Sequence, residues 1–133
     1  MYKILVVEDD FLIRWSLTQA LLQEGYSVIA AEDGRKAIQA TQAEQFDFII
    51  TDLVMPEVDG WQVLENIRQI QPSSRVIIMT AHGNRDTGSV AKERGAWAYI
   101  DKSYLIDRIK TILKESNLSL NRTESQETTR PVM

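Results

Sequence analysis

Carboxylate side chains follow two short apolar runs of the sequence. Asp52 comes just after the run 48–50, and three consecutive acids, Glu8, Asp9 and Asp10, follow the run 3–7. Carboxylates gathered in one cleft repel each other by about 4 kcal/mol per pair at about 4 Å and the effective dielectric of a protein surface. A cation relieves this repulsion, and Mg²⁺ is the natural choice because all the ligands are hard oxygens.

Two more polar side chains follow later apolar runs. Thr80 ends the run 75–80, and Lys102 follows the run 95–100. A lysine offers phosphate a compact positive charge, and a threonine offers it a hydrogen-bond donor. With Asp52 as the nucleophile and Mg²⁺ beside it, this set of groups describes phosphoryl transfer onto an aspartate. Taken singly, each has a plainer interpretation: Asp52 as a loop cap, Thr80 as a loop hydroxyl and Lys102 as a solvated cation.

The elements that must position these groups alternate five times between strand and helix. Apolar runs indicate strands at 3–7, 26–31, 48–50, 75–80 and 95–100, and helical periodicity indicates helices at 11–24, 33–45, 60–70 and 104–115. The weaker segment 81–94 begins with a loop at 82–84, and the fourth helix follows that loop. The fourth helix contains Thr87, Gly88 and Ser89, which are poor helix formers, so we expect it to be short or mobile.

This alternation predicts a parallel sheet with right-handed crossovers and helices on both faces. The expected fold is an α/β, flavodoxin-like (βα)5 three-layer sandwich with strand order 2-1-3-4-5. In that order ligands bind between strands one and three, at the carboxyl ends of the strands. Asp9, Asp10 and Asp52 are therefore expected to meet there, close to Thr80 and Lys102.

Length and composition indicate one domain at 1–115, followed at 116–133 by a polar, disordered tail or the start of a linker. The absence of cysteine excludes disulfides and thiolate chemistry. A net charge of −4 with scattered basic residues argues against direct nucleic-acid binding. No apolar run is long enough for a membrane span and no secretion signal is present, so we expect a cytoplasmic protein without a membrane partner.

Five motifs, in order, resemble those of receiver domains of two-component response regulators, loosely of the nitrogen-regulator type. The resemblance covers about residues 3–115 and rests on Val6-Val7-Glu8-Asp9-Asp10, Thr51-Asp52-Leu-Val-Met-Pro56, Asp59-Gly60, Met79-Thr80-Ala81 and Tyr99-Ile-Asp-Lys102. It implies that a histidine kinase or a phosphotransfer protein donates a phosphoryl group to Asp52. The chain would then be a phosphoacceptor switch that assists its own phosphorylation and dephosphorylation, and not an enzyme.

The same resemblance assigns roles to single residues. Asp10 and Asp52 would hold Mg²⁺ directly, together with the backbone carbonyl of Val54, and Asp9 would help through water. Thr80 would move to bond the phosphoryl group, Lys102 would pair with it, and Tyr99 would turn inward behind Thr80. The face formed by the fourth helix, fifth strand and fifth helix would then be remodelled for a partner, including a second copy of the chain.

Two departures from the family pattern leave an alternative open. Val54 and Ser103 touch the site, so the chain is alternatively a receiver-like module that binds partners without being phosphorylated. A haloacid-dehalogenase-type phosphatase fits poorly because the first strand lacks the Asp-x-Asp pair. Receivers usually have proline after the lysine, with a cis peptide, and a cis bond before another residue costs about 2.5–4 kcal/mol. We therefore expect a trans Lys102–Ser103 bond, a more loosely positioned Lys102, and Ser103 as the cap of the last helix.

Overall fold

Strands and helices alternate along the chain in the predicted order. The computed structural model describes residues 1–129, with side chains described as far as Asn117. The strands are β1 (Lys3–Val7), β2 (Ser27–Ala31), β3 (Phe48–Asp52), β4 (Arg75–Thr80) and β5 (Ala98–Asp101). The helices are α1 (Phe11–Gln23), α2 (Gly34–Ala43), α3 (Gly60–Ile70), α4 (Thr87–Glu93) and α5 (Leu105–Thr129), with a 3₁₀ turn at Lys102–Tyr104. Residues 1–103 form one compact unit, and the chain from Tyr104 onward forms a second.

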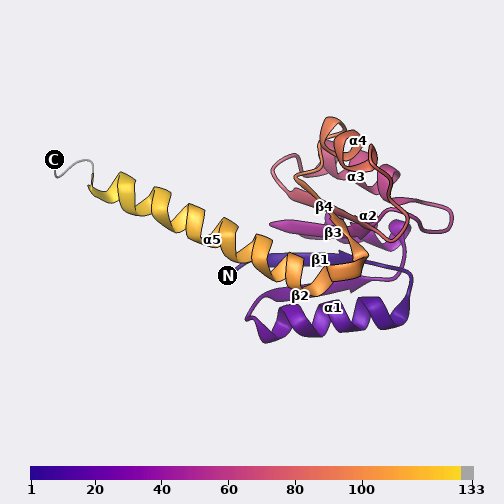
Figure 1. Ribbon diagram of the computed structural model, residues 1–133, viewed down its shortest axis with the longest axis horizontal. Coiled ribbons are helices and arrows are strands. Elements are labelled where there is room, and N and C mark those ends of the chain that lie inside the picture. Colours follow the sequence, from indigo (N-terminus) through magenta and orange to yellow (C-terminus); the bar gives the residue numbers. More distant parts are fainter. Residues whose placement is uncertain (130–133) are drawn as a thin grey trace. The chain divides into compact units, whose positions relative to one another are not determined.

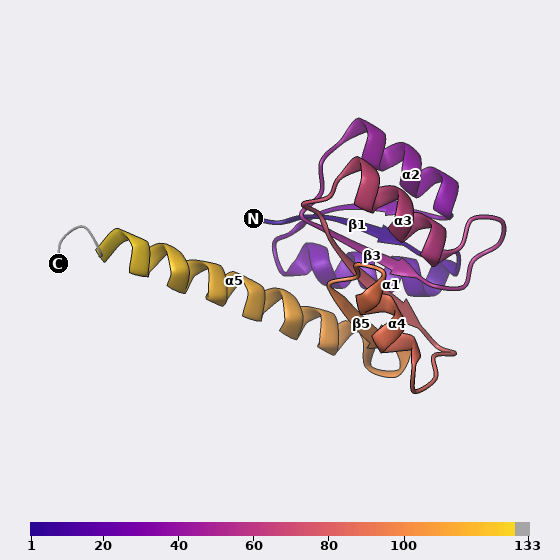
Figure 2. The same cartoon turned by 90° about the horizontal axis from the view of Figure 1, so that it is seen from above.

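The five strands form one parallel sheet in the order β2-β1-β3-β4-β5, which confirms the predicted flavodoxin-like fold. Helix α1 covers one face of the sheet, and α2, α3 and α4 lie on the other (Figures 1 and 2). Every residue of β3 is buried, as are the last four of β1, because both faces of these central strands are covered. The strand register places Val7 opposite Thr51 and Asp52 opposite Met79, so the polar residues at the carboxyl ends lie at one level of the sheet.

Aspartates begin three of the helices that follow strands. The side chains of Asp10, Asp33 and Asp59 accept hydrogen bonds from backbone N–H groups in the first turns of α1, α2 and α3. These bonds satisfy donors that have no partner within the helix. Gly60 then allows α3 to pack directly on the end of β3, because a methyl group at this position would overlap the carbonyl oxygen of Asp52. The caps and this glycine fix the angle at which each helix leaves the carboxyl edge of the sheet.

The lengths of the last two helices can be compared with the sequence prediction, which is right for α4 and wrong for α5. Helix α4 has seven residues, which confirms that it is short. Helix α5 continues to Thr129, whereas the prediction ended it near residue 115 and placed a disordered tail after it. Residues 116–129 contain neither glycine nor proline, so nothing in them stops a helix once it has begun. Residues 130–133 lie outside the described part of the chain, and the domain boundary near residue 115 stays a prediction.

Gln71 joins α3 to the segment that leads into β3. Its amide is 3% exposed; the oxygen accepts from the Phe46 N–H (3.1 Å) and the Ser74 hydroxyl (2.7 Å), and the nitrogen donates to the carbonyls of Thr41 (2.6 Å) and Glu44. A buried amide with all these bonds made stabilises the fold, since each partner would otherwise be buried unpaired. The start of β3, and hence the height of Asp52, is fixed partly by this side chain.

We expect Gln71→Ala to lower the free energy of unfolding by about 2–4 kcal/mol, because it leaves a buried N–H and two carbonyls without partners. Urea unfolding followed by circular dichroism measures the change. Gln69→Ala, at an exposed position of the same helix, is the matched control and should change stability by less than about 0.5 kcal/mol. Equal effects of the two substitutions would contradict this account of Gln71.

Candidate functional site

Asp52 lies at the carboxyl end of β3, where Lys102 and Glu8 reach it from two other strands. The Asp52 side chain is almost fully buried, and its Oδ2 lies 3.1 Å from Lys102 Nζ. The same ammonium group lies 2.7 Å from Glu8 Oε1. Asp52 and Lys102 therefore lie together, as predicted, because the sheet order brings the ends of β3 and β5 to the same edge.

The acidic residues of the β1–α1 turn that lie near Asp52 are not the pair that the sequence predicted. One carboxylate oxygen from each of Glu8, Asp9 and Asp52 lies within 4.8 Å of the others. Asp10 is outside this group: its side chain is exposed and caps α1 by accepting from the Ile13 N–H at 3.1 Å. Glu8 takes the place expected for Asp10 because its N–H still bonds to the carbonyl of Ala31, which extends the strand by one residue. The place of Glu8 directly after the buried residue Val7 was the sequence signal that could have identified it as the pocket acid.

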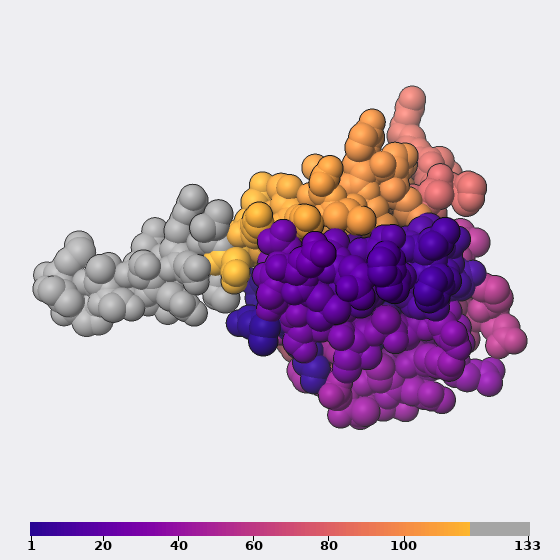
Figure 3. Space-filling view, turned by 90° about the horizontal axis from the view of Figure 1, so that it is seen from below, coloured from indigo at the N-terminus to yellow at the C-terminus, as the bar shows by residue number. Residues whose placement is uncertain are grey.

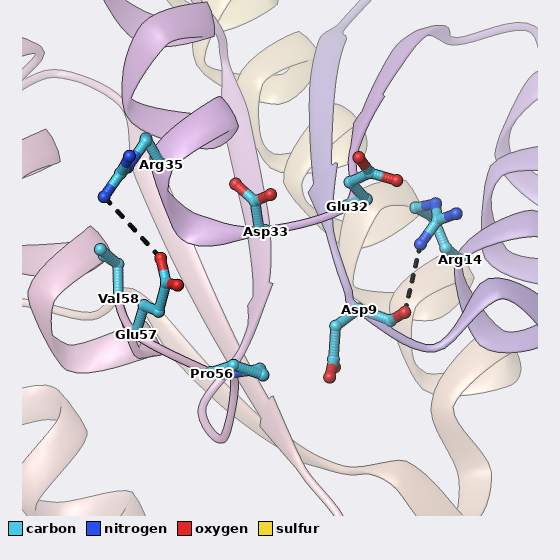
Figure 4. A pocket seen from close by; sticks show the side chains of 8 residues that line it. All are labelled: Asp9, Arg14, Glu32, Asp33, Arg35, Pro56, Glu57 and Val58. Carbon is cyan, nitrogen blue, oxygen red and sulfur yellow. Dashed lines mark hydrogen bonds and ion pairs between the residues drawn. The ribbon is translucent and has the colours of Figure 1, made fainter.

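Arg14 holds the turn that carries these acids. Its Nη1 donates to the carbonyl oxygen of Glu8 at 2.8 Å and reaches that of Asp9 at 3.4 Å. Figure 4 shows Arg14 beside Asp9 at one end of a pocket of about 390 Å³, with Arg35 and Glu57 paired at the other end. Arg14 belongs to the Ile13-Arg14-Trp15 segment, which resembles receivers of the nitrogen-regulator type, but the sequence predicted no role for it because its contacts depend on how α1 leaves the sheet.

Burial strongly perturbs the ionisation of Glu8. The pKa of Glu8 rises from 4.5 to about 8, chiefly because the carboxyl is buried; the neighbouring Asp52 carboxylate contributes to the rise, and Lys102 opposes it. Burial alone would lower the pKa of Lys102, but its hydrogen bonds to Glu8 and Asp52 and their charges outweigh burial, so this pKa is raised. Glu8 Oε2 is buried without a hydrogen-bond partner. The site is thus short of positive charge and of hydrogen-bond donors.

Thr80 and Tyr99 lie on neighbouring strands beside the start of the α4 segment. Thr80 is buried, and its hydroxyl oxygen accepts from the His82 N–H at 3.1 Å. The Tyr99 ring occupies space that a side chain at Gly83 would fill, and it contacts the position of a side chain at Gly88 (3.3 Å). These glycines therefore leave room for the ring beside Thr80, an arrangement that strand spacing alone did not reveal.

The loop after β5 follows the sequence prediction only in part. The Lys102–Ser103 bond is trans, as expected, since no described peptide bond is cis. Ser103 does not cap the last helix; it lies in the 3₁₀ turn and donates its N–H to Asp101 Oδ1 at 2.9 Å. Lys102 is not loosely held either, because its two carboxylate partners fix the ammonium group. The two ion pairs here position Lys102, as a following proline with its rigid ring would otherwise do.

Val54 follows Asp52 at the mouth of the site. Its side chain is 58% exposed, and its N–H points at Asp52 Oδ1 at 3.4 Å. Three residues further on, Glu57 adopts a φ of 63°, which a residue with a side chain adopts at some cost. The turn from Val54 to Glu57 is therefore shaped around the end of β3.

The parallel sheet thus carries clustered carboxylates and a lysine at its carboxyl edge. Residues 4–114 match the family described as the response regulator receiver domain, and the chain belongs to that family. Receiver domains are phosphoacceptor switch domains, not classical enzymes; they bind Mg²⁺ at an acidic site and interact with histidine kinases or phosphotransfer proteins. No described helix has the length and apolar character that crossing a membrane requires.

Two sequence relatives differ in how much of their length the chain covers. The chain is 36% identical over 111 residues to the DNA-binding transcriptional regulator NtrC of Proteus hauseri, which covers 84% of this chain and 24% of that protein. It is 35% identical over 113 residues to sporulation initiation phosphotransferase F of Bacillus subtilis, covering 85% and 91%. The chain therefore spans about a quarter of one relative and nearly all of the other.

Solved structures agree with the fold. A receiver domain protein from Clostridium thermocellum superposes with a TM-score of 0.80 at 28% identity, covering 95% of this chain and 99% of that one. The response regulator TrrA from Thermotoga maritima, solved in complex with Mg²⁺ and BeF, superposes with a TM-score of 0.77 at 31% identity, covering 86% and 98%.

We expect the metal-free protein to lose up to about 4 kcal/mol of stability as the pH rises from about 5 to about 8. In this range the unfolded Glu8 is ionised, whereas the folded Glu8, with its pKa raised from 4.5 to about 8, still holds its proton. The unfolded state binds fewer protons, so stability falls as the pH rises. Urea unfolding with a chelator present measures the slope.

Glu8→Gln should flatten this pH dependence because the amide does not titrate. Asp9→Asn, at an exposed position of the same cluster, is the control and should leave the slope in place. A slope that persists unchanged in Glu8→Gln would show that another group is responsible.

Proposed function

We propose that Asp52 accepts a phosphoryl group from a histidine kinase or a phosphotransfer protein. The observation that carries this proposal is the Asp52 carboxylate itself, buried at a strand end with Lys102 Nζ at 3.1 Å and two further carboxylates beside it. An Asp52 oxygen attacks phosphorus while the bond to the donor's imidazole nitrogen breaks, and the electron pair leaves with that nitrogen. The chain assists this step, and the later hydrolysis, by positioning groups around Asp52.

The donor set fits a Mg²⁺ ion. Glu8, Asp9 and Asp52 offer hard oxygens within one cluster, and Glu8 Oε2 has no other partner. We propose Asp9 and Asp52 as direct ligands with the Val54 backbone carbonyl, and Glu8 as the supporting acid in place of Asp10. The ion, when bound, would neutralise charge on the phosphoryl oxygens.

Lys102, Thr80 and Tyr99 respond to the new phosphoryl group. Lys102 exchanges part of its pairing with Asp52 and Glu8 for a phosphoryl oxygen, a short movement because its ammonium group is already at Asp52. Thr80 exchanges its bond from the His82 N–H for one that it donates to the phosphoryl group. Tyr99, which already lies next to Gly83 and Gly88, follows Thr80.

The exposed surface of α1 is the proposed docking site of the phosphodonor. Phe11, Leu12, Trp15 and Leu22 are 45–70% exposed on this helix, which begins directly after the acidic turn. Figure 3 shows the face of the molecule that α1 covers. An exposed apolar stripe of this kind fits the apolar face of a partner helix, and a donor bound there is next to Asp52.

Three further assignments come from the family. We propose a cytoplasmic protein whose receiver domain ends near residue 115 and is followed by a tail or linker. We also propose an output through the fourth helix, fifth strand and fifth helix, including a homodimer. The short α4, whose N-cap Asp86 makes no side-chain capping bond, fits an element that changes conformation.

The alternative is a receiver-like module that binds partners without phosphorylation. Beryllofluoride, which mimics a phosphoryl group, separates the two in the presence of Mg²⁺. An intact pocket should give a saturable change at the Thr80 and Lys102 amide signals in NMR spectra, and no change would favour the alternative.

We expect Asp52→Asn to abolish phosphoryl uptake from acetyl phosphate, because it removes the nucleophile while keeping the shape of the side chain. Intact-protein mass spectrometry measures the gain of one phosphoryl group. Asp47→Asn is the matched control: Asp47 bonds the Lys3 N–H near the opposite end of the same strand, and this variant should be labelled like the wild type. Persistent labelling of Asp52→Asn would exclude Asp52 as the acceptor.

A second prediction concerns the lifetime of the phosphorylated protein. Val54 presents an apolar, 58% exposed side chain at the mouth of the site and cannot orient the hydrolytic water. We expect Val54→Asn to shorten the lifetime of phospho-Asp52 several-fold, because the amide can bond that water. Val54→Ala, equally unable to bond it, is the control, and a wild-type protein that decays faster than Val54→Asn would refute the idea.

A further inference from the structure

A groove lies on the α3 side of the molecule, outside the Asp52 site. It has a volume of about 430 Å³ and is lined by Trp61, Leu64, Glu65, Arg68, Gln69 and Arg94. The α3 residues repeat at helical spacing on one face of the helix. Leu64 is buried, and Trp61 is half-buried against the core. The groove thus combines an apolar lining with two guanidinium groups.

Both arginines are held in place without a carboxylate partner. The Arg94 guanidinium carbon lies 4.8 Å from the centre of the Trp61 ring, in a cation–π contact. Arg68 donates from Nη1 to the carbonyl of Pro72 at 3.1 Å, and its side chain lies against Gly95, where a Cβ atom would be 2.7 Å from Arg68 Nε. The two cations are therefore positioned before any ligand arrives, which lowers the entropy cost of binding.

Charge in the groove has the opposite sign to that of the whole chain. Among the residues whose side chains are described, neither Arg68 nor Arg94 forms an ion pair. Glu65 is the one acid among the lining residues, so the groove carries +1 while the chain carries −4. Guanidinium groups present paired donors that match carboxylates. Complementary charge therefore favours an acidic ligand.

We propose that this groove binds an acidic segment of a partner protein, in which two carboxylates flank an aliphatic side chain. The carboxylates pair with Arg68 and Arg94, and the aliphatic side chain packs on Trp61. A nucleic acid fits less well, because Glu65 and the net negative charge repel a continuous polyanion. This contact does not involve Asp52 or its ligands, so it is a separate interaction surface.

Three capped peptides test the proposal, each with one leucine between two glutamates spaced two, three or four residues apart. Indole N–H signals of Trp15, Trp61 and Trp97, assigned from Trp→Phe variants, are followed in ¹⁵N NMR spectra of the full chain up to about 10 mM peptide. We expect saturable shifts of the Trp61 signal with at least one spacing. Arg68→Gln and Arg94→Gln should each weaken that binding about fivefold or more, and Glu65→Gln should tighten it.

Arg75→Gln is the matched control, because Arg75 stacks on the Trp97 ring (5.4 Å) in the same way but does not line the groove; it should leave binding unchanged. The proposal is overturned if none of the three peptides shifts Trp61, or if the glutamine versions act equally well. It also fails if the arginine variants bind normally, or if a thymidine oligonucleotide of matched charge binds more tightly than every peptide.

Discussion

The site depends on one lysine placed between two buried carboxylates. The carboxyl ends of β1 and β3 bring Glu8 and Asp52 together, and Lys102 from the end of β5 lies within 3.1 Å of both. Burying such charges is costly unless they are paired, and a neutralised Glu8 is the other way to reduce the cost. The carboxylates of the cluster therefore repel each other, and a bound cation or a phosphoryl group would change the charge balance around them. This is the physical basis of a switch at this edge of the sheet.

The acids at the carboxyl edge have two separate duties. Asp10, Asp33 and Asp59 cap helices and set how α1, α2 and α3 leave the sheet. Glu8, Asp9 and Asp52 form the carboxylate cluster, and Lys102 pairs with two of them. The division is physical, because a capping carboxylate has its oxygen committed to a backbone N–H. Asp9 and Asp10, although adjacent in sequence, therefore differ: Asp10 caps α1, and Asp9 belongs to the carboxylate cluster.

Stability is distributed unevenly around the pocket. On the α2–α3 side, the buried Gln71 amide and the close contact of Gly60 with β3 tie the elements firmly. On the other side, α4 is short, lacks a side-chain cap, and has Gly88 packed against the Tyr99 ring. Fewer specific contacts therefore hold the α4 side than the α2–α3 side. Arg94 at the end of α4 also stacks on Trp61 of α3, so the proposed acidic-segment groove borders α4.

The fold, the strand order and the places of Asp52, Thr80 and Lys102 at the ends of strands could all be predicted from the sequence. This was possible because apolar runs, helical periodicity and the topology of parallel sheets place strand ends at one edge. The sequence could not decide which of Glu8, Asp9 and Asp10 faces the pocket, because that depends on where β1 leaves its hydrogen-bond ladder and which acid the next helix uses as a cap. It also could not place Lys102 without a following proline, or pair Arg94 with Trp61, since contacts between residues distant in sequence are set by packing.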